Sequence, residues 1–392
     1  MTSSQDPSHH PAEHADPAEP AAPAERLSPL HAVHVAAGAS FTDFAGWQMP
    51  VRYSSDLAEH HAVRTAAGLF DLSHMAEFGV TGPEAGVFLD AAFAGALSAI
   101  ELGQAKYSLL LTPEGGIVDD VVVYRLGETA FLVVANASNR APVAEALRDR
   151  VDGYDAELLD SSDDTALIAV QGPRSREILE STPGFDAPGL DTLRYYRAID
   201  ATFEGAPVLL ARTGYTGEDG FELYLAPARA EALWRSVAAA GEPLGLVPAG
   251  LASRDTLRLE AGMPLYGHEL SLETQPVQAG LGRVVAQGKP SFVGRDAVLA
   301  GPGEGASVLV GLVAEGKRAA RADYLVFEND DAAEPVGIVT SGALSPSLGH
   351  PIALAYVAPE FAEPGTELSV DIRGKRLAFR TTALPFYRRK KD

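Results

Sequence analysis

The pattern of hydrophobic and polar positions changes once along the chain. Up to about residue 300, short apolar stretches with strand character are mixed with segments whose apolar residues recur at helical spacing, such as 56–68, 228–240 and 248–261. Their order shows no regular strand–helix alternation, which predicts α+β modules. Beyond about residue 307, six short alternating segments follow instead, and they predict a small all-β barrel or sandwich. These segments are 308–313, 324–327, 335–340, 352–357, 367–372 and 377–382.

Other local signals predict single elements. Residues 107–111 and 117–124 are expected to pair as strands, joined by a glycine-containing turn at 113–116. Ser28-Pro29 predicts a helix start with proline at the first helical position. The stretch 43–51 predicts an irregular, turn-rich connection.

We expect three units along the chain. Residues 1–26 hold almost no large apolar side chain, so they cannot offset their ordering entropy, and we predict a disordered acidic tail. Residues 27–302 are expected to be α+β, and the glycine-rich stretch 301–305 marks the boundary to a β unit at 303–392. Three histidines of the tail are expected to be solvated and not metal-binding: His9, His10 and His14.

Composition and charge exclude several classes of function. The absence of cysteine removes disulfides, thiolate catalysis, iron–sulfur ligation and cysteine-based zinc sites. A formal net charge of −22 argues against a nucleic-acid partner, because phosphates need a basic surface. No apolar run approaches the roughly 18 residues of a membrane span, and we see no secretory signal. A cytoplasmic location and no membrane partner are therefore expected.

Two glycine-rich stretches carry the candidate chemistry. Asp119 and Asp120 follow the turn at 113–116, and adjacent strand residues point to opposite faces, so only one is expected to face a given pocket. That pair is either a solvated strand end or a source of a carboxylate that acts on a ligand amine by charge and hydrogen bonding.

The second stretch, 212–222, lacks the lysine of a phosphate-binding loop and the spacing of a dinucleotide fingerprint. Glu222, between two apolar strand residues, is expected to be partly buried and to need a partner, for which Arg254 is the natural candidate. Ser73 and His74 are adjacent and are not expected to align as a nucleophile–base pair.

A set of short motifs in fixed order resembles the T-protein of the glycine cleavage system, a tetrahydrofolate-dependent aminomethyltransferase. The resemblance spans about residues 27–388. The motifs are FAGWQMP at 44–50, FDLSHM at 70–75, GGIVDD at 115–120, QGP at 171–173, RTGYTGEDGFE at 212–222, GLASRD at 250–255, LRLEAG at 257–262, TSG at 340–342, SPSLG at 345–349 and PFY at 385–387.

The resemblance implies a three-domain cloverleaf around a central folate channel, with two interleaved α+β domains and a C-terminal β-barrel. It implies transfer of a one-carbon unit from the aminomethyl-lipoyl arm of H-protein to tetrahydrofolate. The products are 5,10-methylenetetrahydrofolate, ammonia and dihydrolipoyl H-protein. Tetrahydrofolate is then a co-substrate, and the reaction needs no metal, nicotinamide or flavin. The resemblance also implies that the enzyme acts with the P-, H- and L-proteins.

The resemblance also implies roles for individual residues. Asp120 matches the catalytic carboxylate, and Glu222 the residue that hydrogen-bonds the pterin ring. The remaining expected folate contacts are Met75, Tyr107, Asn136, Tyr195, Tyr215, Arg254, Tyr387 and Arg388.

The chain departs from the family pattern at two positions. Arg283 stands where many relatives carry tryptophan, which puts the packing around the folate tail in question, and Ser253 replaces the commoner alanine.

Two rival functions use the same fold. A folate-dependent oxidase would need a flavin domain, for which this chain has no fingerprint. The iron–sulfur maintenance proteins need a cysteine motif, and this chain has no cysteine. A non-catalytic folate-binding paralogue of the same fold is kept as the alternative.

Overall fold

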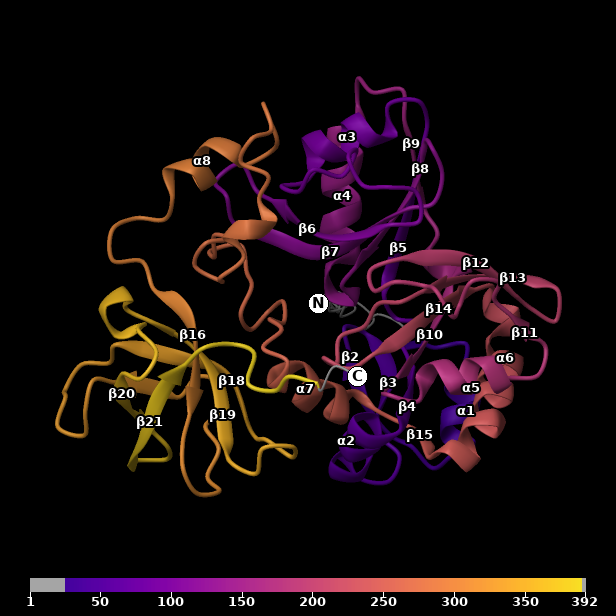
Figure 1. Cartoon of the computed structure of the whole chain (residues 1–392). Coiled ribbons are helices and arrows are strands. Elements are labelled where there is room, and N and C mark those ends of the chain that lie inside the picture. The colour runs from indigo at the N-terminus through magenta and orange to yellow at the C-terminus, as the bar shows by residue number, and fades with distance from the viewer. Residues whose placement is uncertain (1–24, 390–392) are drawn as a thin grey trace, which may run out of the picture.

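The computed structural model describes residues 25–389, and it has three bodies of secondary structure arranged around a common centre (Figure 1). Two are mixed α+β and the third is a closed six-stranded barrel. The predicted tail falls outside the described residues, except for Glu25 and Arg26. Order starts before Leu27, because Arg26 and Leu27 pair with β3 (Trp47–Arg52).

A seven-stranded sheet forms the first α+β body, with α5 (Ser175–Ser181) and α6 (Pro227–Gly241) packed against one face. Apolar residues of α6 at helical spacing, Ala230, Leu233, Trp234 and Val237, are buried against that face. The strands are, in spatial order, β11 (Phe185–Asp186), β12 (Ala198–Phe203), β13 (Ala206–Ala211), β14 (Gly220–Leu225), β10 (Ala166–Gln171), β4 (Ala67–Asp71) and β15 (Leu246–Pro248).

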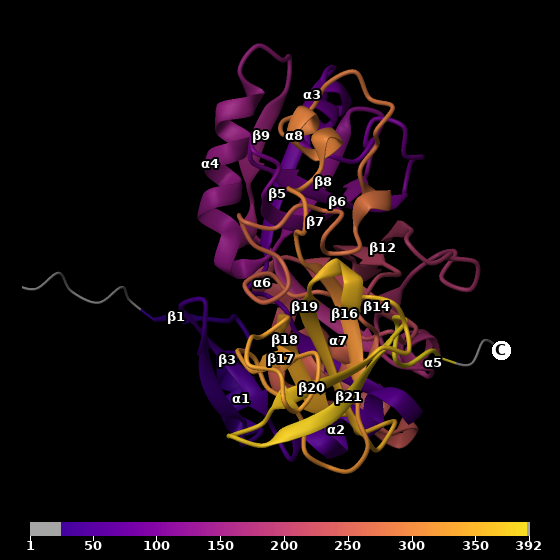
Figure 2. The same ribbon diagram turned by 90° about the vertical axis from the view of Figure 1, so that its left-hand side faces the viewer.

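A five-stranded sheet forms the second α+β body, with α3 (Ala85–Ala92) and α4 (Arg140–Val151) on its outer face (Figure 2). Its strands are, in spatial order, β6 (Ala105–Leu111), β7 (Ile117–Arg125), β8 (Ala130–Ala135), β5 (Ala76–Thr81) and β9 (Glu157–Asp160). The chain enters this sheet from β4 through residues 72–75 and leaves it through 161–165 into β10. The two α+β bodies are therefore interleaved in sequence, as the family resemblance implies.

The six strands expected at the C-terminal end are confirmed, and they close into a barrel. In sequence order they are β16 (Val308–Val313), β17 (Leu325–Phe327), β18 (Gly337–Leu344), β19 (Pro351–Val357), β20 (Glu367–Asp371) and β21 (Arg376–Thr382). Alternate side chains fill the barrel interior, among them Val310, Leu312 and Val370. The exact domain bounds of 27–302 and 303–392 stay a prediction.

Two local predictions were wrong. Residues 43–51 are not irregular, because β2 (Ser40–Phe44) and β3 form a hairpin whose two-residue turn has Ala45 at φ 53° and Gly46 at φ 81°. Positive φ at both positions matches the twist of the strands, and a non-glycine residue at the first position hid this signal. Pro29 precedes the helix, because α1 (His31–Ala36) starts two residues later.

The remaining elements lie within or between the three bodies. Helix α7 (Leu251–Glu260) packs on α2 (Asp56–Thr65) and also contacts β18 and β19 of the barrel. It is shorter than the predicted 248–261 because Leu246–Pro248 pairs with β4. The others are β1 (Arg26–Leu27), α8 (Arg295–Ala300) and the 3₁₀ turns Ala137–Asn139, Ser162–Asp164, Glu242–Leu244, Gly282–Val284 and Pro359–Phe361. Within residues 25–389, no helix combines the length and apolarity that crossing a membrane requires.

Candidate functional site

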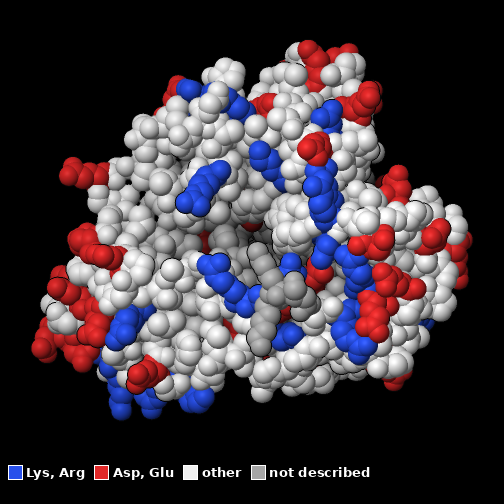
Figure 3. Space-filling view, in the orientation of Figure 1, with Lys and Arg blue, Asp and Glu red and all other residues white. Residues whose placement is uncertain are grey.

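A cavity of about 660 Å³ opens between the two α+β bodies, and it forms a hollow in the space-filling view with basic side chains around it (Figure 3). Because successive side chains of a strand point to opposite faces of the sheet, alternate residues of β14 and β7 line this cavity. In β14, Phe221 and Leu223 face the helices, so Glu222 and Tyr224 face inward. In β7 the same alternation turns Asp120, Val122 and Tyr124 inward. The cavity thus lies between the inner faces of the two sheets.

Asp119 and Asp120 separate as strand alternation predicts, since Asp120 lines the cavity and Asp119 is fully buried. Asp119 accepts hydrogen bonds from the Asn136 backbone N–H (2.9 Å) and the Asn139 amide (2.6 Å). The alternative of a solvated strand end is therefore wrong. The two carboxyls are also not independent, because the Asn136 amide nitrogen is 2.8 Å from an oxygen of each.

Burial shifts the acidity of this pair. It raises the pKa of Asp119 to about 8, with the neighbouring Asp120 charge adding to the shift. Burial also raises the pKa of Asp120 to about 6, against the opposing effect of hydrogen bonds from Tyr107 (3.0 Å) and Asn136. The negative charge of each carboxyl therefore disfavours ionisation of the other, and the hydrogen bonds to Asp120 favour its ionised form.

Glu222 stands on the opposite sheet and is surrounded by hydroxyl groups. Its Oε2 accepts hydrogen bonds from Thr213, from Tyr124 (3.4 Å) and from Tyr224 (3.5 Å). Burial raises the pKa of Glu222, and the hydroxyl donors and the charge of Arg254 oppose this.

The expected ion pair between Glu222 and Arg254 does not form among the described residues. The Arg254 guanidinium instead lies over the Tyr215 ring, 4.8 Å from its centroid. Thr213 and the two tyrosines satisfy Glu222, so Arg254 acts on it through charge alone.

The glycine-rich loop that carries Tyr215 is shaped by packing. Gln171 lies inside the loop, where its amide donates to the Thr213 carbonyl (3.0 Å) and its Oε1 accepts from Thr216 (3.0 Å). A Cβ at Gly214 would be 2.0 Å from the Gln171 amide group, so any larger residue there would displace Gln171 from these hydrogen bonds. The loop is thus anchored to β10 and presents Tyr215 to the cavity.

The structure brings seven of the ten predicted site residues to the cavity wall and leaves three outside. Tyr195 is 43% exposed and near Arg389 (5.8 Å), while the cavity wall is formed by Tyr196, which has a positive φ of 59°. Tyr387 and Arg388 are outside the lining as well; Arg388 is exposed and bonds weakly to the Leu384 carbonyl. The seven are Met75, Tyr107, Asp120, Asn136, Tyr215, Glu222 and Arg254.

Sequence reasoning missed several wall residues. Tyr124 and Tyr224 had a usable signal, because each is an even number of residues from a predicted site carboxylate on its own strand. Phe44, His74 and the segment 262–268 had no such signal. Ser73 pairs with the Leu167 backbone (3.2 Å) and His74 turns to the cavity, so they form no nucleophile–base pair, as expected.

Two further expectations concern Arg283 and metal binding. Arg283 is exposed and lines a separate surface pocket with Val277 and Val298, away from the central cavity. The Arg283 side chain therefore contributes nothing to the wall of the central cavity. Within the described part of the chain, no cluster of three or more His, Asp or Glu side chains is arranged to hold a metal ion.

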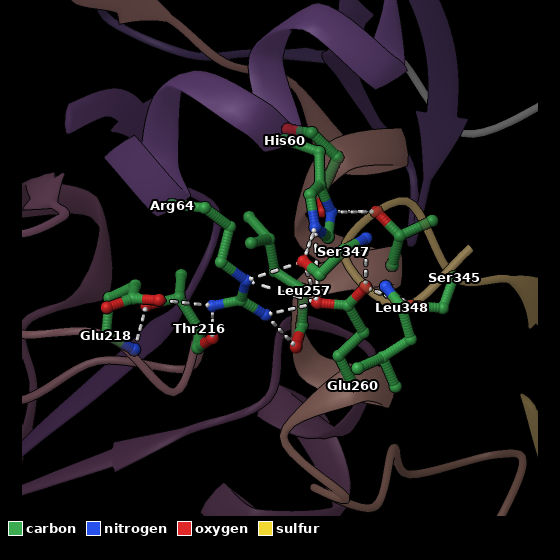
Figure 4. A network of polar contacts seen from close by, with 11 residues as sticks. His60, Arg64, Thr216, Glu218, Leu257, Glu260, Ser345, Ser347 and Leu348 are labelled. Carbon is green, nitrogen blue, oxygen red and sulfur yellow. Dashed lines mark hydrogen bonds and ion pairs between the residues drawn. The ribbon is translucent and has the colours of Figure 1, made fainter. Parts of the chain in front are cut away.

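Next to the cavity, a buried polar network ties the barrel to the first α+β body through α2 and α7 (Figure 4). Arg64 of α2 donates to Glu260 of α7 (2.8 Å), to Glu218 (3.0 Å) and to the Thr216 carbonyl (2.7 Å). From the barrel, Ser347 donates to Glu260 through its hydroxyl (2.7 Å) and backbone N–H (2.9 Å). Ser345 also donates to Glu260. This network fixes the Tyr215 loop relative to α7.

Comparison with known proteins agrees with this architecture. Residues 30–289 match the family model of the GCVT N-terminal domain, and residues 308–388 match that of the glycine cleavage T-protein C-terminal barrel domain. A curated aminomethyltransferase of Cutibacterium acnes is 55% identical, with 92% of this chain and 98% of that protein covered. One of Corynebacterium jeikeium is 53% identical at the same coverage.

The structure is also similar to a crystal structure of glycine cleavage system aminomethyltransferase T from Bartonella henselae. The TM-score is 0.86 at 35% identity, covering 94% of this chain and 99% of that one. Fold, cavity and relatives together define an enzyme of the aminomethyltransferase class. More particularly, the chain belongs to the glycine cleavage T-protein family.

Proposed function

We propose that this enzyme transfers the carbon of an aminomethyl group, carried on the lipoyl arm of H-protein, to tetrahydrofolate. The carbon leaves sulfur and nitrogen and forms bonds to N5 and N10 of the folate, whose two protons pass to the thiolate and the amine. The products are 5,10-methylenetetrahydrofolate, dihydrolipoyl H-protein and ammonia. The observation that carries the proposal is the Asp120 carboxylate, held toward the cavity by Tyr107 and Asn136.

Asp120 acts in this proposal by charge and position. An iminium-like transition state is positively charged, and a fixed carboxylate with a buried side chain stabilises it more strongly than water does. Tyr107 and Asn136 hold the carboxylate in place before the reaction, so little reorganisation is needed when charge develops.

Glu222 receives the pterin ring in this proposal. The amino-pyrimidine edge of a pterin presents paired N–H donors, which complement a carboxylate. The arrangement of the site fits, since three hydroxyl groups leave Glu222 ionisable at the cavity wall. Arg254, stacked on Tyr215, supplies the positive charge that favours that ionised form, and Met75 and Tyr215 supply surfaces for the ring.

The chemistry sets the accessory requirements. Because the transferred carbon keeps its oxidation level, the step needs no nicotinamide or flavin, and in this proposal no metal takes part. Tetrahydrofolate is a co-substrate. We infer that the enzyme works in the cytoplasm with the P-, H- and L-proteins of the glycine cleavage system.

The test is product formation from aminomethylated H-protein and tetrahydrofolate. Formation of 5,10-methylenetetrahydrofolate with stoichiometric ammonia supports the proposal. Tetrahydrofolate binding without either product would instead support a non-catalytic folate-binding paralogue. If the protein neither binds tetrahydrofolate nor forms these products, it is not a folate enzyme.

A further inference from the structure

His74 is a cavity residue to which the proposed mechanism assigns no task. It lies in the crossing from β4 to β5, is 4% exposed, and lines the cavity. Its ring packs edge-on against Phe44, with centroids 5.2 Å apart. Its position is therefore fixed by packing, and its only open side is the cavity.

The imidazole of His74 has no hydrogen-bond partner among residues 25–389. Its Nδ1 is fully buried without one, and no described side chain or backbone group bonds to Nε2. Because Nδ1 is fully buried, a ligand in the cavity meets the ring at Nε2, which is accessible and has no hydrogen-bond partner among the described residues.

The charge state of His74 favours hydrogen bonding over ion pairing. Burial lowers its pKa to about 4; nearby Asp71 opposes the shift and the Arg254 charge adds to it. The ring is therefore neutral at physiological pH, with one N–H donor and one acceptor nitrogen. Arg254 lines the same cavity as His74 and Glu222, and its charge acts on both of them.

We propose that His74 is a further substrate-recognition residue, whose imidazole hydrogen-bonds the pterin ring of the folate. This inference rests on the proposed function, because it uses the pterin position assigned to Glu222. Glu222 accepts hydrogen bonds from the donor edge of the pterin ring, and His74 hydrogen-bonds a second polar atom of that ring. The two residues together fix the orientation of the ring. His74 makes this contact to the ring and not to the glutamate tail.

The experiment compares the dissociation constants of tetrahydrofolate and of 6-methyltetrahydropterin, which lacks the tail, for wild type, His74→Phe and His74→Gln. Phenylalanine keeps the ring packing and removes the hydrogen bond, so His74→Phe is expected to weaken both ligands by about tenfold. Glutamine retains a donor and an acceptor and is expected to recover part of that loss. The KM for aminomethylated H-protein is expected to change little.

The matched control is His31→Phe. His31 also has a buried Nδ1 without a partner and packs on a phenylalanine, Phe41 (4.8 Å), but it does not line the cavity. This control is expected to bind both ligands as wild type does, and thermal unfolding of each variant shows whether it is folded.

The outcomes separate the two levels of inference. If wild type binds tetrahydrofolate and His74→Phe binds it equally well, the role of His74 is overturned while the proposed function stands. A loss for tetrahydrofolate alone also overturns it, since the contact is then to the tail. Failure of wild type to bind either ligand overturns the proposed function itself.

Discussion

At the residue scale, the neighbouring carboxyls of Asp119 and Asp120 differ through their surroundings. Three N–H donors from Asn136 and Asn139 surround Asp119 in the interior, while Asp120 has one side open to the cavity. Like charges this close disfavour double ionisation. Asp119 thus influences the ionisation of its neighbour from the interior, and Asp120 is the carboxylate that can contact a substrate in the cavity.

Replacing Asp120 with asparagine is expected to lower kcat by about 100-fold or more, while the dissociation constant of tetrahydrofolate changes by less than about threefold. The side chain keeps its size but loses the charge that stabilises the transition state. Stopped-flow transfer and equilibrium binding measure the two quantities. Equal losses in both would make Asp120 a binding residue.

The pH dependence of the reaction follows from the raised pKa of Asp120. Since the charged carboxylate is the active form, kcat/KM is expected to rise with pH, about tenfold per unit, and to level above about pH 6. A pH–rate profile of wild type and Asp120→Asn checks this, because the variant should lack that limb. A limb that persists in the variant would assign it to another group.

Much of the site could be predicted at this scale, and the misses have physical causes. Strand alternation correctly predicted that only one of Asp119 and Asp120 faces the cavity, and the family resemblance indicated which one. The resemblance also pointed to Tyr195, but the structure places the neighbouring Tyr196, with its positive φ, in the cavity wall. The partner of Glu222 was wrong because local hydroxyl donors, which spacing does not reveal, replaced the distant Arg254.

At the element scale, α2, α7 and the loop between β18 and β19 are joined through one buried carboxylate. Glu260 accepts from Arg64, Ser345 and Ser347, and it lies 3.2 Å from the His60 ring nitrogen. Burial alone would raise its pKa, but the hydrogen bond and charge of His60, followed by Ser345 and Arg64, lower it to about 2. Three elements from distant parts of the sequence are therefore held together by their contacts with the Glu260 carboxylate.

Replacing Glu260 with glutamine is expected to destabilise the fold by about 3 kcal/mol, because Arg64 is left in the interior with only Glu218 to neutralise it. The free energy of unfolding in urea measures this. Because the folded pKa is below the usual 4.5, the contribution of Glu260 is present above about pH 4.5 and is lost as pH falls toward 2. Wild type should therefore approach the variant in acid.

The matched control is Glu177→Gln, which breaks an exposed pair with Arg174. Surface pairs contribute at most about 1 kcal/mol, so this change should be nearly neutral. Similar losses in both variants would contradict a special role for the buried network.

At the scale of the whole molecule, the barrel was the most predictable part and the relation of the two sheets the least. All six barrel strands were predicted from their short alternating segments, although β16 pairs with the distant β19 and β21. The assignment of β4 and β5 to different sheets depends on long-range pairing with β10 and β8, which periodicity cannot identify. The interleaving was anticipated only through the family resemblance.

The barrel supplies none of the cavity-lining residues in the described chain, so it acts on the site through its contacts. One is Tyr387, beyond the last barrel strand, whose ring lies 4.0 Å from the Arg64 guanidinium and whose N–H donates to the Glu260 carbonyl (2.8 Å). The segment after β21 therefore returns from the barrel to α2 and α7 and covers the buried network.

Replacing Tyr387 with leucine is expected to reduce the free energy of unfolding by about 1 kcal/mol more than replacing it with phenylalanine does, because only the aromatic ring attracts the Arg64 cation. The same variant is expected to raise the KM for tetrahydrofolate, since Arg64 holds the Thr216 carbonyl and with it the Tyr215 loop. Urea unfolding and steady-state kinetics test both parts. If leucine and phenylalanine behave alike in both, the stacked ring does not connect the barrel to the site, and the serines of the β18–β19 loop alone make that connection.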